Sequence, residues 1–518
     1  MKDLVSKFAG PLVVFGWLAT VGCGGGGNPP SSQQVSAPPQ TQQQSQPGDT
    51  QSLTADEVRT IVNTAAAAAK DAFVVAVSDR AGRPLAVFRK TGAPMTAVGN
   101  FSVSVDANEL ALALARTAAF FSNDQAPLSS RTVRYLSGIH FPPGVANTSN
   151  APLYGIENTN RGCLLSGNFI AGQELPPARA LSGAIGLGIL TGKPDLTDSN
   201  EIAVNPGGVP IYKNGEVAGG IGVVGSTPEI SEFVALSASA PSLPSFPAPG
   251  AVVINGITVP FVVQTTMPAG ISSDPNFTGS YVLGPVDSAG PAPNGYLVGP
   301  QAGALGGLSA AEVMSIVSNA VSTASLTRAV IRLPIGQRTK MAISVTDLDG
   351  TVLALYRMPD ATIFSVDVSV GKARNMTYFN SAQVNSADLP GVPAGTALTN
   401  RTLGFGAQPF YPPGINGSSN GPFFQLYVND VNQPCTQGSQ PPGPKQSGIV
   451  FFPGSVGLYR NGILVGGLGV SGDGVDQDDY VTAGGAVGFE APAAIRADQI
   501  IDNNVRLPYL KFPRNPTE

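Results

Sequence analysis

The chain repeats itself, and this repetition constrains its fold more than any other feature of the sequence. The clearest match pairs residues 128–152 with 398–422 without a gap. Further matches follow in the same order and pair 53–63 with 308–318, 77–89 with 345–357, 115–121 with 373–379, and 212–223 with 459–470. Matches that keep one order indicate a duplicated structural unit. We therefore expect the body of the protein to be one fold present twice.

Both copies predict the same order of secondary-structure elements. In the first copy, helices are expected at 53–70, at 105–121 and after Ser226, and strands at 73–78, 84–88, 209–212 and 217–224. The helices show apolar residues at helical spacing, and the strands are short apolar runs. Thr54 is the expected N-cap of the first helix. Two hairpins in one antiparallel sheet predict two tandem α+β domains, each a sheet covered by helices over one face, with long loop insertions.

The amino terminus is typical of a secretory signal. Lys2 and Lys7 precede an apolar run over 8–21, which is too short to span a bilayer. The run ends at Thr20-Val21-Gly22-Cys23, which resembles a bacterial lipobox, so we expect Cys23 to carry a lipid. An ordinary signal peptide with a chance cysteine is the alternative. These residues predict a protein of the cell envelope, held at the outer membrane or the periplasmic face by the lipid.

The rest of the chain divides by composition and by the repeat. Residues 1–23 are the expected signal, and a Gly/Pro/Gln/Ser-rich tether follows over 24–52. The first copy spans 53–240, a Pro/Gly-rich linker 241–306, the second copy 307–495 and a tail 496–518. The tether lacks the apolar residues that a core requires. Within the linker, Asn255-Gly256 predicts a small hairpin.

Charge and composition exclude several classes of partner and site. The net charge is −5 and no Lys/Arg cluster occurs, so a nucleic-acid partner is not expected. His140 is the only histidine, which excludes a multi-histidine metal site, and no C-x-x-C is present. Cys163 and Cys435 occupy nearly matching places in the two copies. In an oxidising envelope they form either one bridge between the copies or two separate thiols.

Three motifs give each copy a family resemblance. The first is a V-x-D-x-x-G turn followed by arginine, and the second is a K-A-R helix, kept as Lys372-Ala373-Arg374 but altered to Leu114-Ala115-Arg116 in the first copy. The third is a glycine-rich segment that ends in G-G-x-G-V. The motifs lie at 77–89, 114–116 and 207–223, and at 345–357, 372–374 and 454–472. In this order they resemble the HbpS/GlcG family of haem-binding and haem-degrading-like proteins. Both copies depart from the family by insertions at about 124–205 and 383–452.

The resemblance implies haem or a related small anionic ligand, and an assembly of several domains, either a homo-oligomer or a pseudo-dimer within one chain. His140 would be the only imidazole able to bind iron. Arg131, Arg134 and Arg401 could pair with propionates, and Tyr135 could stack on the macrocycle. The alternative for His140 is an ordinary loop residue, since the second copy has Phe410 there. The alternative for Arg131 and Arg401 is to tie a long loop to the sheet.

Aspartates near the end of the second copy invite a metal interpretation. They are Asp473, Asp476, Asp478 and Asp479. Their spacing does not match an EF-hand loop. Acidic residues in the first turn of a helix also cap it, and capping is the preferred interpretation. No metal site is therefore predicted.

Three functional interpretations remain open. The first is an exported, lipid-anchored protein that binds haem or a related small ligand without catalysis. The second is an envelope scaffold that kept the fold and lost the ligand, in line with the different motifs eroded in each copy. The third is an enzyme that degrades haem or acts on an organic acid, although no nucleophile motif is present in the sequence.

Overall fold

A computed structural model describes residues 52–123, 126–159, 163, 189–245, 248–288, 293–330 and 336–517. The predicted signal, Cys23 and the tether up to residue 51 lie outside these residues. Within the described part of the chain, no helix is long and apolar enough to cross a membrane.

The first copy has the predicted order of elements. Its main elements are α1 (Ala55–Ala68), β1 (Val74–Asp79), β2 (Pro84–Lys90), α2 (Ala107–Phe121), β5 (Gly208–Lys213), β6 (Glu216–Val224) and α4 (Pro228–Ser239). Shorter elements lie between them: β3 (Thr96–Val98), β4 (Ser104–Asp106) and α3 (Ser130–Tyr135). As predicted, Thr54 caps α1, in a capping box with Glu57.

The second copy repeats this order. Its elements are α5 (Ala310–Leu326), β11 (Ala342–Thr346), β12 (Val352–Arg357), α6 (Phe364–Phe379), α7 (Asn400–Gly406), α8 (Phe424–Asn432), β13 (Ser455–Arg460), β14 (Ile463–Ser471) and α9 (Val475–Gly485). Each β1-like strand lies between its two partners in the same register, since Val75 pairs with Val223 and Ile343 with Val470. The two halves are therefore one fold present twice, as the repeats predict.

Each copy builds a five-stranded sheet, and the linker supplies one strand to each. The strand orders are β5-β6-β1-β2-β9 and β10-β12-β11-β14-β13, with all neighbours antiparallel. The fifth strands, β9 (Gly279–Leu283) and β10 (Gly295–Val298), both lie in the predicted linker. The linker was expected to contribute only a small hairpin, so its role in both sheets is a correction.

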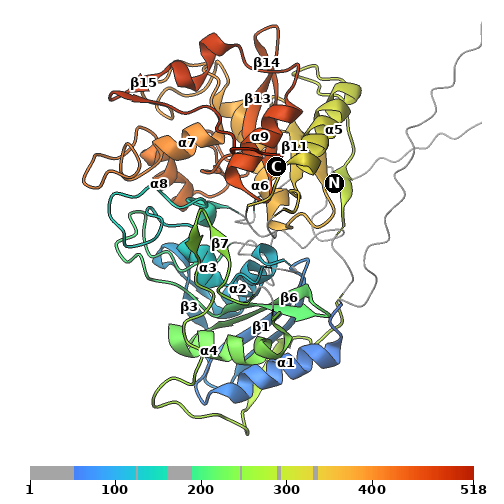
Figure 1. Cartoon of the computed structure of the whole chain (residues 1–518), viewed down its shortest axis with the longest axis vertical. Coiled ribbons are helices and arrows are strands. Elements are labelled where there is room, and N and C mark those ends of the chain that lie inside the picture. The colour runs from blue at the N-terminus through green and yellow to red at the C-terminus, as the bar shows by residue number, and fades with distance from the viewer. Residues whose placement is uncertain are drawn as a thin grey trace, which may run out of the picture. The chain divides into compact units, whose positions relative to one another are not determined.

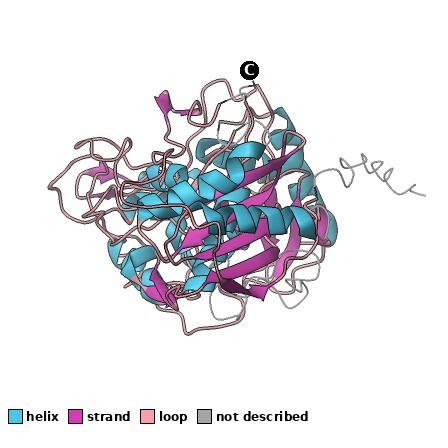
Figure 2. Ribbon diagram, turned by 90° about the horizontal axis from the view of Figure 1, so that it is seen from below, coloured by secondary structure: helices cyan, strands magenta, loops and turns pink. Residues whose placement is uncertain are grey.

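Helices cover both faces of each sheet, and the prediction of helices over one face is wrong. Every residue of β1 is buried. Val75 and Val77 pack with α1 and α4, whereas Val74 and Ala76 pack with α2 on the other face. A strand with apolar side chains on both faces needs cover on both. Figure 2 shows helices lying across the strands.

The two copies meet through the helices that follow their first hairpins. One apolar cluster contains Phe120 and Phe121 of α2 together with Phe364 and Val366 of α6. The Phe121 and Phe364 rings lie 5.0 Å apart. Figure 1 shows α2 and α6 between the two sheets. The copies thus form a pseudo-dimer within one chain.

Glycines in the last hairpin allow these helices to pack against the sheet. A Cβ added to Gly222 would lie 1.9 Å from the carbonyl oxygen of Ala111 in α2, and one added to Gly469 would lie 2.1 Å from that of Ser369 in α6. Glycine is the residue that permits so close a backbone approach. These strand glycines therefore serve packing in both copies.

The tail is the counterpart of the linker hairpin, a match that the predicted boundaries miss. The linker hairpin is β7 (Val253–Ile254) with β8 (Ile257–Thr258), and the tail hairpin is β15 (Ile501–Asp502) with β16 (Val505–Arg506). After each, a proline carbonyl accepts a hydrogen bond from an insertion threonine: Pro260 from Thr132 and Pro508 from Thr402, both at 2.6 Å. The repeated unit thus extends beyond 53–240 and 307–495.

Candidate functional site

A cleft of about 520 Å³ lies where the second copy meets the first copy and the linker. Ser149 and Asn150 of the first insertion and Asn255 of the linker hairpin form one side. Ala151, Pro152 and Ile254 belong to the same two segments, and the other lining residues come from the second copy and its tail, including α7 and the start of α9. The volume lies within the range of small-molecule sites, about 300–1,000 Å³.

The cleft is lined by four cations and one carboxylate. The cations are Arg328, Arg401, Lys511 and Arg514, and the carboxylate is Asp476. Asp476 accepts from Arg401 at 2.6 Å and from Lys511 at 2.9 Å. Arg401 also binds Asp479, which is fully buried. Burial would lower the pKa of Arg401, but the carboxylates of Asp479 and Asp476 outweigh burial and raise it.

The charge balance leaves two guanidinium groups uncompensated. Arg401 and Lys511 are matched by Asp476 and Asp479. Within the described part of the chain, the side chains of Arg328 and Arg514 make no hydrogen bond or ion pair. Phe405, which is partly exposed, adds aromatic surface to the same cleft, and Phe451 lies nearly buried behind it. The cleft can therefore hold an anion next to an apolar body.

His140 lies elsewhere, buried between the two copies. Its Nδ1 is 3.0 Å from a carboxylate oxygen of Glu201, and its Nε2 is 2.8 Å from the side-chain oxygen of Asn416 in the second copy. The ring also lies beside Phe410, with centroids 6.1 Å apart. Both ring nitrogens therefore have protein partners, and the histidine joins the copies.

The other predicted ligand residues of the first copy also have protein partners. Arg131 in α3 pairs with both carboxylate oxygens of Glu232 in α4, at 2.6 and 2.9 Å. Arg134 binds Asp198 at 3.1 Å, and Tyr135 packs edge-on against Phe141. Of the predicted ligand residues, only Arg401 lines the cleft.

Buried polar residues surround these contacts at the interface between the copies. Lys193 is fully buried, lies 3.5 Å from Asp198, and sits over the rings of Tyr154 and Tyr427 at 4.9 and 5.5 Å. Burial lowers the pKa of a lysine, but Asp198 and Glu157 outweigh this and raise the pKa of Lys193. The cluster thus keeps its charges paired within the interface.

The C-terminal aspartates bind cations and backbone groups of the protein. Asp473 accepts from the backbone N–H of Lys340 at 2.7 Å, while Asp476 and Asp479 bind Arg401. The N-cap of α9 is Gly474, and no side chain caps the helix. Asp476 and Asp478 do lie in the first turn of α9, where acidic residues suit the helix dipole, so the part of the capping interpretation that fails is a side-chain hydrogen bond to the free N–H groups. Among the described residues, no group of three or more His, Cys, Asp or Glu could hold a metal ion.

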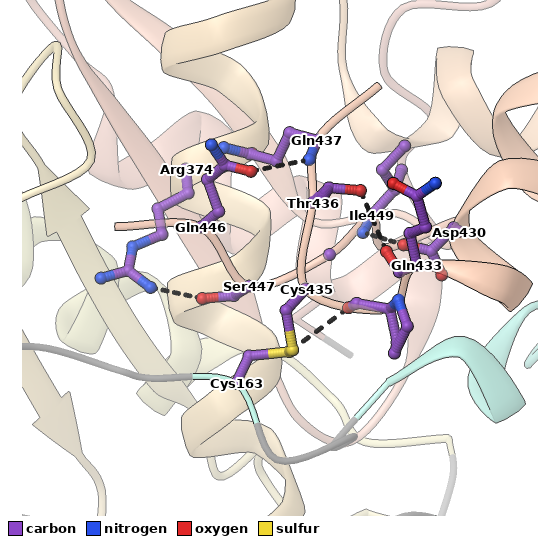
Figure 3. Close-up of a disulfide and its surroundings, with 12 residues drawn as sticks. Cys163, Arg374, Asp430, Gln433, Cys435, Thr436, Gln437, Gln446, Ser447 and Ile449 are labelled. Carbon is purple, nitrogen blue, oxygen red and sulfur yellow. Dashed lines mark hydrogen bonds between the residues drawn. A yellow bond between two sulfur atoms is a disulfide. The ribbon is translucent and has the colours of Figure 1, made fainter. Parts of the chain in front are cut away.

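Cys163 and Cys435 are bonded to each other in the structure. Their Cα atoms lie 5.3 Å apart, across a sequence separation of 272. Figure 3 shows the bond between a segment of the first insertion and the loop that follows α8. Of the two alternatives that the sequence left open, the structure has the bridge between the copies.

Comparison with protein families places the fold. A model of the family described as "Haem degrading protein HbpS-like" matches residues 53–240 and 318–486, which is more than half of the chain. The chain belongs to this HbpS-like family. The first matched region covers the first copy, and the second lies within the second copy, from inside α5 to the end of α9.

Individual relatives match only part of the HbpS-like chain. The corrinoid adenosyltransferase PduO of Salmonella typhimurium is 27% identical over 153 residues, and that of Citrobacter freundii 26% over 155 residues. Each match covers 30% of this chain and 33% of the relative, so the chain spans about a third of the length of these relatives. Similar solved structures include Klebsiella pneumoniae ORFY, which is 19% identical over 36% of this chain and 92% of that one, with a TM-score of 0.24. A PduOC–haem complex is 22% identical over 36% of this chain and 96% of that one, also with a TM-score of 0.24. A double mutant of Streptomyces reticuli HbpS is 17% identical, over 35% of this chain and 87% of that one, with a TM-score of 0.21.

The motifs shared with the HbpS-like family form the interior of each copy. Arg116 and Arg374 are buried, and their Nε groups donate to the carbonyl oxygens of Gly82 and Gly350, at 2.6 and 2.9 Å. The arginine of the K-A-R helix thereby holds the turn of the first hairpin in both copies.

The lysine of the K-A-R motif is present only in the second HbpS-like copy, where it forms a buried ion pair. Lys372 Nζ lies 2.9 Å from Asp478 and 2.7 Å from the carbonyl oxygen of Val470. Burial raises the pKa of Asp478 to about 7, against the effect of Lys372. The first copy has Leu114 and Ser231 in these places. The pair thus distinguishes the two copies.

Sequence reasoning missed three cations of the cleft. Lys511 and Arg514 lie in the tail, beyond both regions that match the HbpS-like family, and Arg328 follows α5. One available signal is the match between Val259-Pro260-Phe261 of the linker and Leu507-Pro508-Tyr509 of the tail. It indicates that the tail lies against the second insertion as the linker lies against the first.

Proposed function

We propose that this protein is an exported, lipid-anchored binding protein whose cleft takes a small anionic ligand, of which haem is the leading candidate. The observation that carries the proposal is the pair of uncompensated guanidinium groups beside aromatic surface in a cleft of suitable volume. The membership of an HbpS-like family named for haem adds support. Arginine binds carboxylates in bidentate geometry, so propionates suit this wall.

The residues present fit the carboxylate groups of haem but not ligation of its iron. Arg328 and Arg514 could pair with the propionates, and Phe405 could contact the macrocycle. The described residues that line the cleft include no histidine, cysteine, methionine or tyrosine. Those are the common axial ligands of haem iron. We therefore propose that side chains hold the ligand in the cleft without an iron–protein bond.

A titration with haemin tests the proposal. Purified protein should shift the Soret band with saturation in the micromolar range, and protoporphyrin IX, which lacks iron, should bind within a few-fold of the same affinity. Binding that requires iron would contradict the proposed mode. An absence of binding by either compound would contradict ligand binding itself.

The His140→Ala variant should keep its Soret shift and lose stability. We expect a loss of about 1–3 kcal/mol, because the change removes a buried ring that packs beside Phe410 and hydrogen-bonds to Glu201 and Asn416. Urea unfolding measures the loss, and a parallel haemin titration measures the spectrum. A folded variant that no longer shifts the Soret band would show instead that His140 binds the iron.

The Cys23→Ser variant should lose its membrane attachment. In the proposed precursor, Cys23 accepts the lipid and becomes the first mature residue. Cells supplied with labelled palmitate should label the wild-type chain and not the variant, and the variant should leave the membrane fraction. Equal labelling of both chains would contradict the anchor.

A scaffold without ligand is the second candidate. The observation in its favour is that His140, Arg131 and Arg134 all bind protein groups. Such pairing is what a structural role requires. An unchanged haemin spectrum at micromolar concentration, together with an intact fold, would favour this candidate over a binding protein.

A further inference from the structure

We infer that each chain binds one ligand and that this ligand carries two carboxylates. The inference rests on the proposed function and makes it specific. A duplicated fold would ordinarily supply two equivalent sites, so the number of ligands per chain depends on how the two copies differ around the cleft.

Part of the cleft is repeated in the first copy. Arg401 with Asp479 corresponds to Arg131 with Glu232, which joins α3 to α4 in the same way. Arg328 corresponds to Lys70, since each follows the first helix of its copy. The backbone N–H of Arg328 donates to Pro516 in the tail at 2.6 Å, and that of Lys70 donates to Ser272 in the linker at 2.8 Å. The first copy therefore keeps the framework of the site.

The tail cations have no counterpart in the first copy. Lys511 and Arg514 follow the tail hairpin, whereas the matching linker segment, residues 262–267, contains neither lysine nor arginine. Arg131 there faces a carboxylate that also accepts from the backbone of Gln264. At this position the first copy has Lys70 as its one cation beyond the Arg131–Glu232 pair, whereas the second copy has two arginines, Arg328 and Arg514, beyond the cations that carboxylates match. Among the described residues, only the second copy can therefore pair a guanidinium with each of two carboxylates, and one such site per chain follows.

The charge of the cleft indicates the charge of its ligand. Arg401 and Lys511 are neutralised by Asp476 and Asp479, which leaves the positive charges of Arg328 and Arg514. These two come from separate segments, one after α5 and one in the tail. A guanidinium binds one carboxylate through two parallel hydrogen bonds. A dicarboxylate with an apolar body over Phe405 satisfies both arginines.

The experiment uses calorimetric titration of the whole chain with protoporphyrin IX and with its dimethyl ester, in which both carboxylates are blocked. We expect one equivalent of the free acid to bind. Arg328→Gln and Arg514→Gln should each weaken its binding about ten- to a hundredfold, because each removes a charge-assisted hydrogen-bonded contact. Arg59→Gln, at an exposed arginine of α1, is the control and should change nothing.

The ester separates the carboxylates from the rest of the ligand. The affinity of the wild-type chain for the ester should equal the affinity of the double variant Arg328→Gln/Arg514→Gln for the free acid. The double variant should bind the ester as well as the wild-type chain does. Two equivalents, or equal affinities for acid and ester, would overturn the inference while ligand binding stands. If neither the free acid nor haemin binds the wild-type chain, the proposed function fails as well.

Discussion

Replacing either cysteine of the Cys163–Cys435 bridge by serine should lower the free energy of unfolding by about 5 kcal/mol. The bridge closes a loop with a sequence separation of 272, and a cross-link over a long loop removes much of the conformational entropy of the unfolded chain. Guanidinium unfolding of the oxidised wild type and of the Cys163→Ser variant measures the difference.

The two single variants and the double variant provide the control for this result. Cys163→Ser, Cys435→Ser and the double replacement should lose equal stability, because each removes the same bond. Reduction of the wild type should reproduce the loss and should leave the variants unchanged. A wild type whose unfolding midpoint does not respond to reduction would mean that the two sulfurs are separate thiols.

Replacing Lys372 by methionine should destabilise the second copy by about 3–5 kcal/mol, because it leaves the carboxyl group of Asp478 buried without its cation. Lys372 is fully buried and Asp478 nearly so. Burial already raises the pKa of Asp478 to about 7, and removal of the lysine takes away the main opposing effect. Urea unfolding measures the loss of stability.

The first copy supplies the control for this variant. Leu114 and Ser231 occupy the same positions there without an ion pair. A Lys372→Leu/Asp478→Ser chain should therefore recover most of the stability that Lys372→Met loses, since no charge is then left without a partner. If the double variant is as unstable as the single one, the lysine contributes through its packing over Phe452 rather than through its charge.

Local features of the fold could be predicted because they depend on neighbouring residues. The capping box at Thr54 depends on only a few neighbouring residues. The same holds for the tight turn at Asn214-Gly215, in which both turn residues have positive φ. The strands β9 and β10 could not be predicted, because short linker strands form only against an edge that the rest of the sheet provides. The second helical layer required knowing that both faces of β1 are apolar and buried.

The candidate site was harder to predict than the fold. Arg401 could be found because the repeat presents it twice, as Arg131 and Arg401. Arg328 and Arg514 carry no motif, and only folding brings the end of α5 and the tail to one cleft. His140 attracted a ligand role because it is the sole imidazole, yet its two hydrogen bonds serve the contact between copies.

Joining the two copies in one chain, with α2 packed on α6, changes what mutation can do to the pair. In a symmetric dimer of identical subunits, each substitution appears twice, so a cation gained on one side is gained on both. A fused pair escapes this coupling. One half can acquire basic residues in its tail while the other half keeps neutral ones, and the partner is always present at a ratio of one to one.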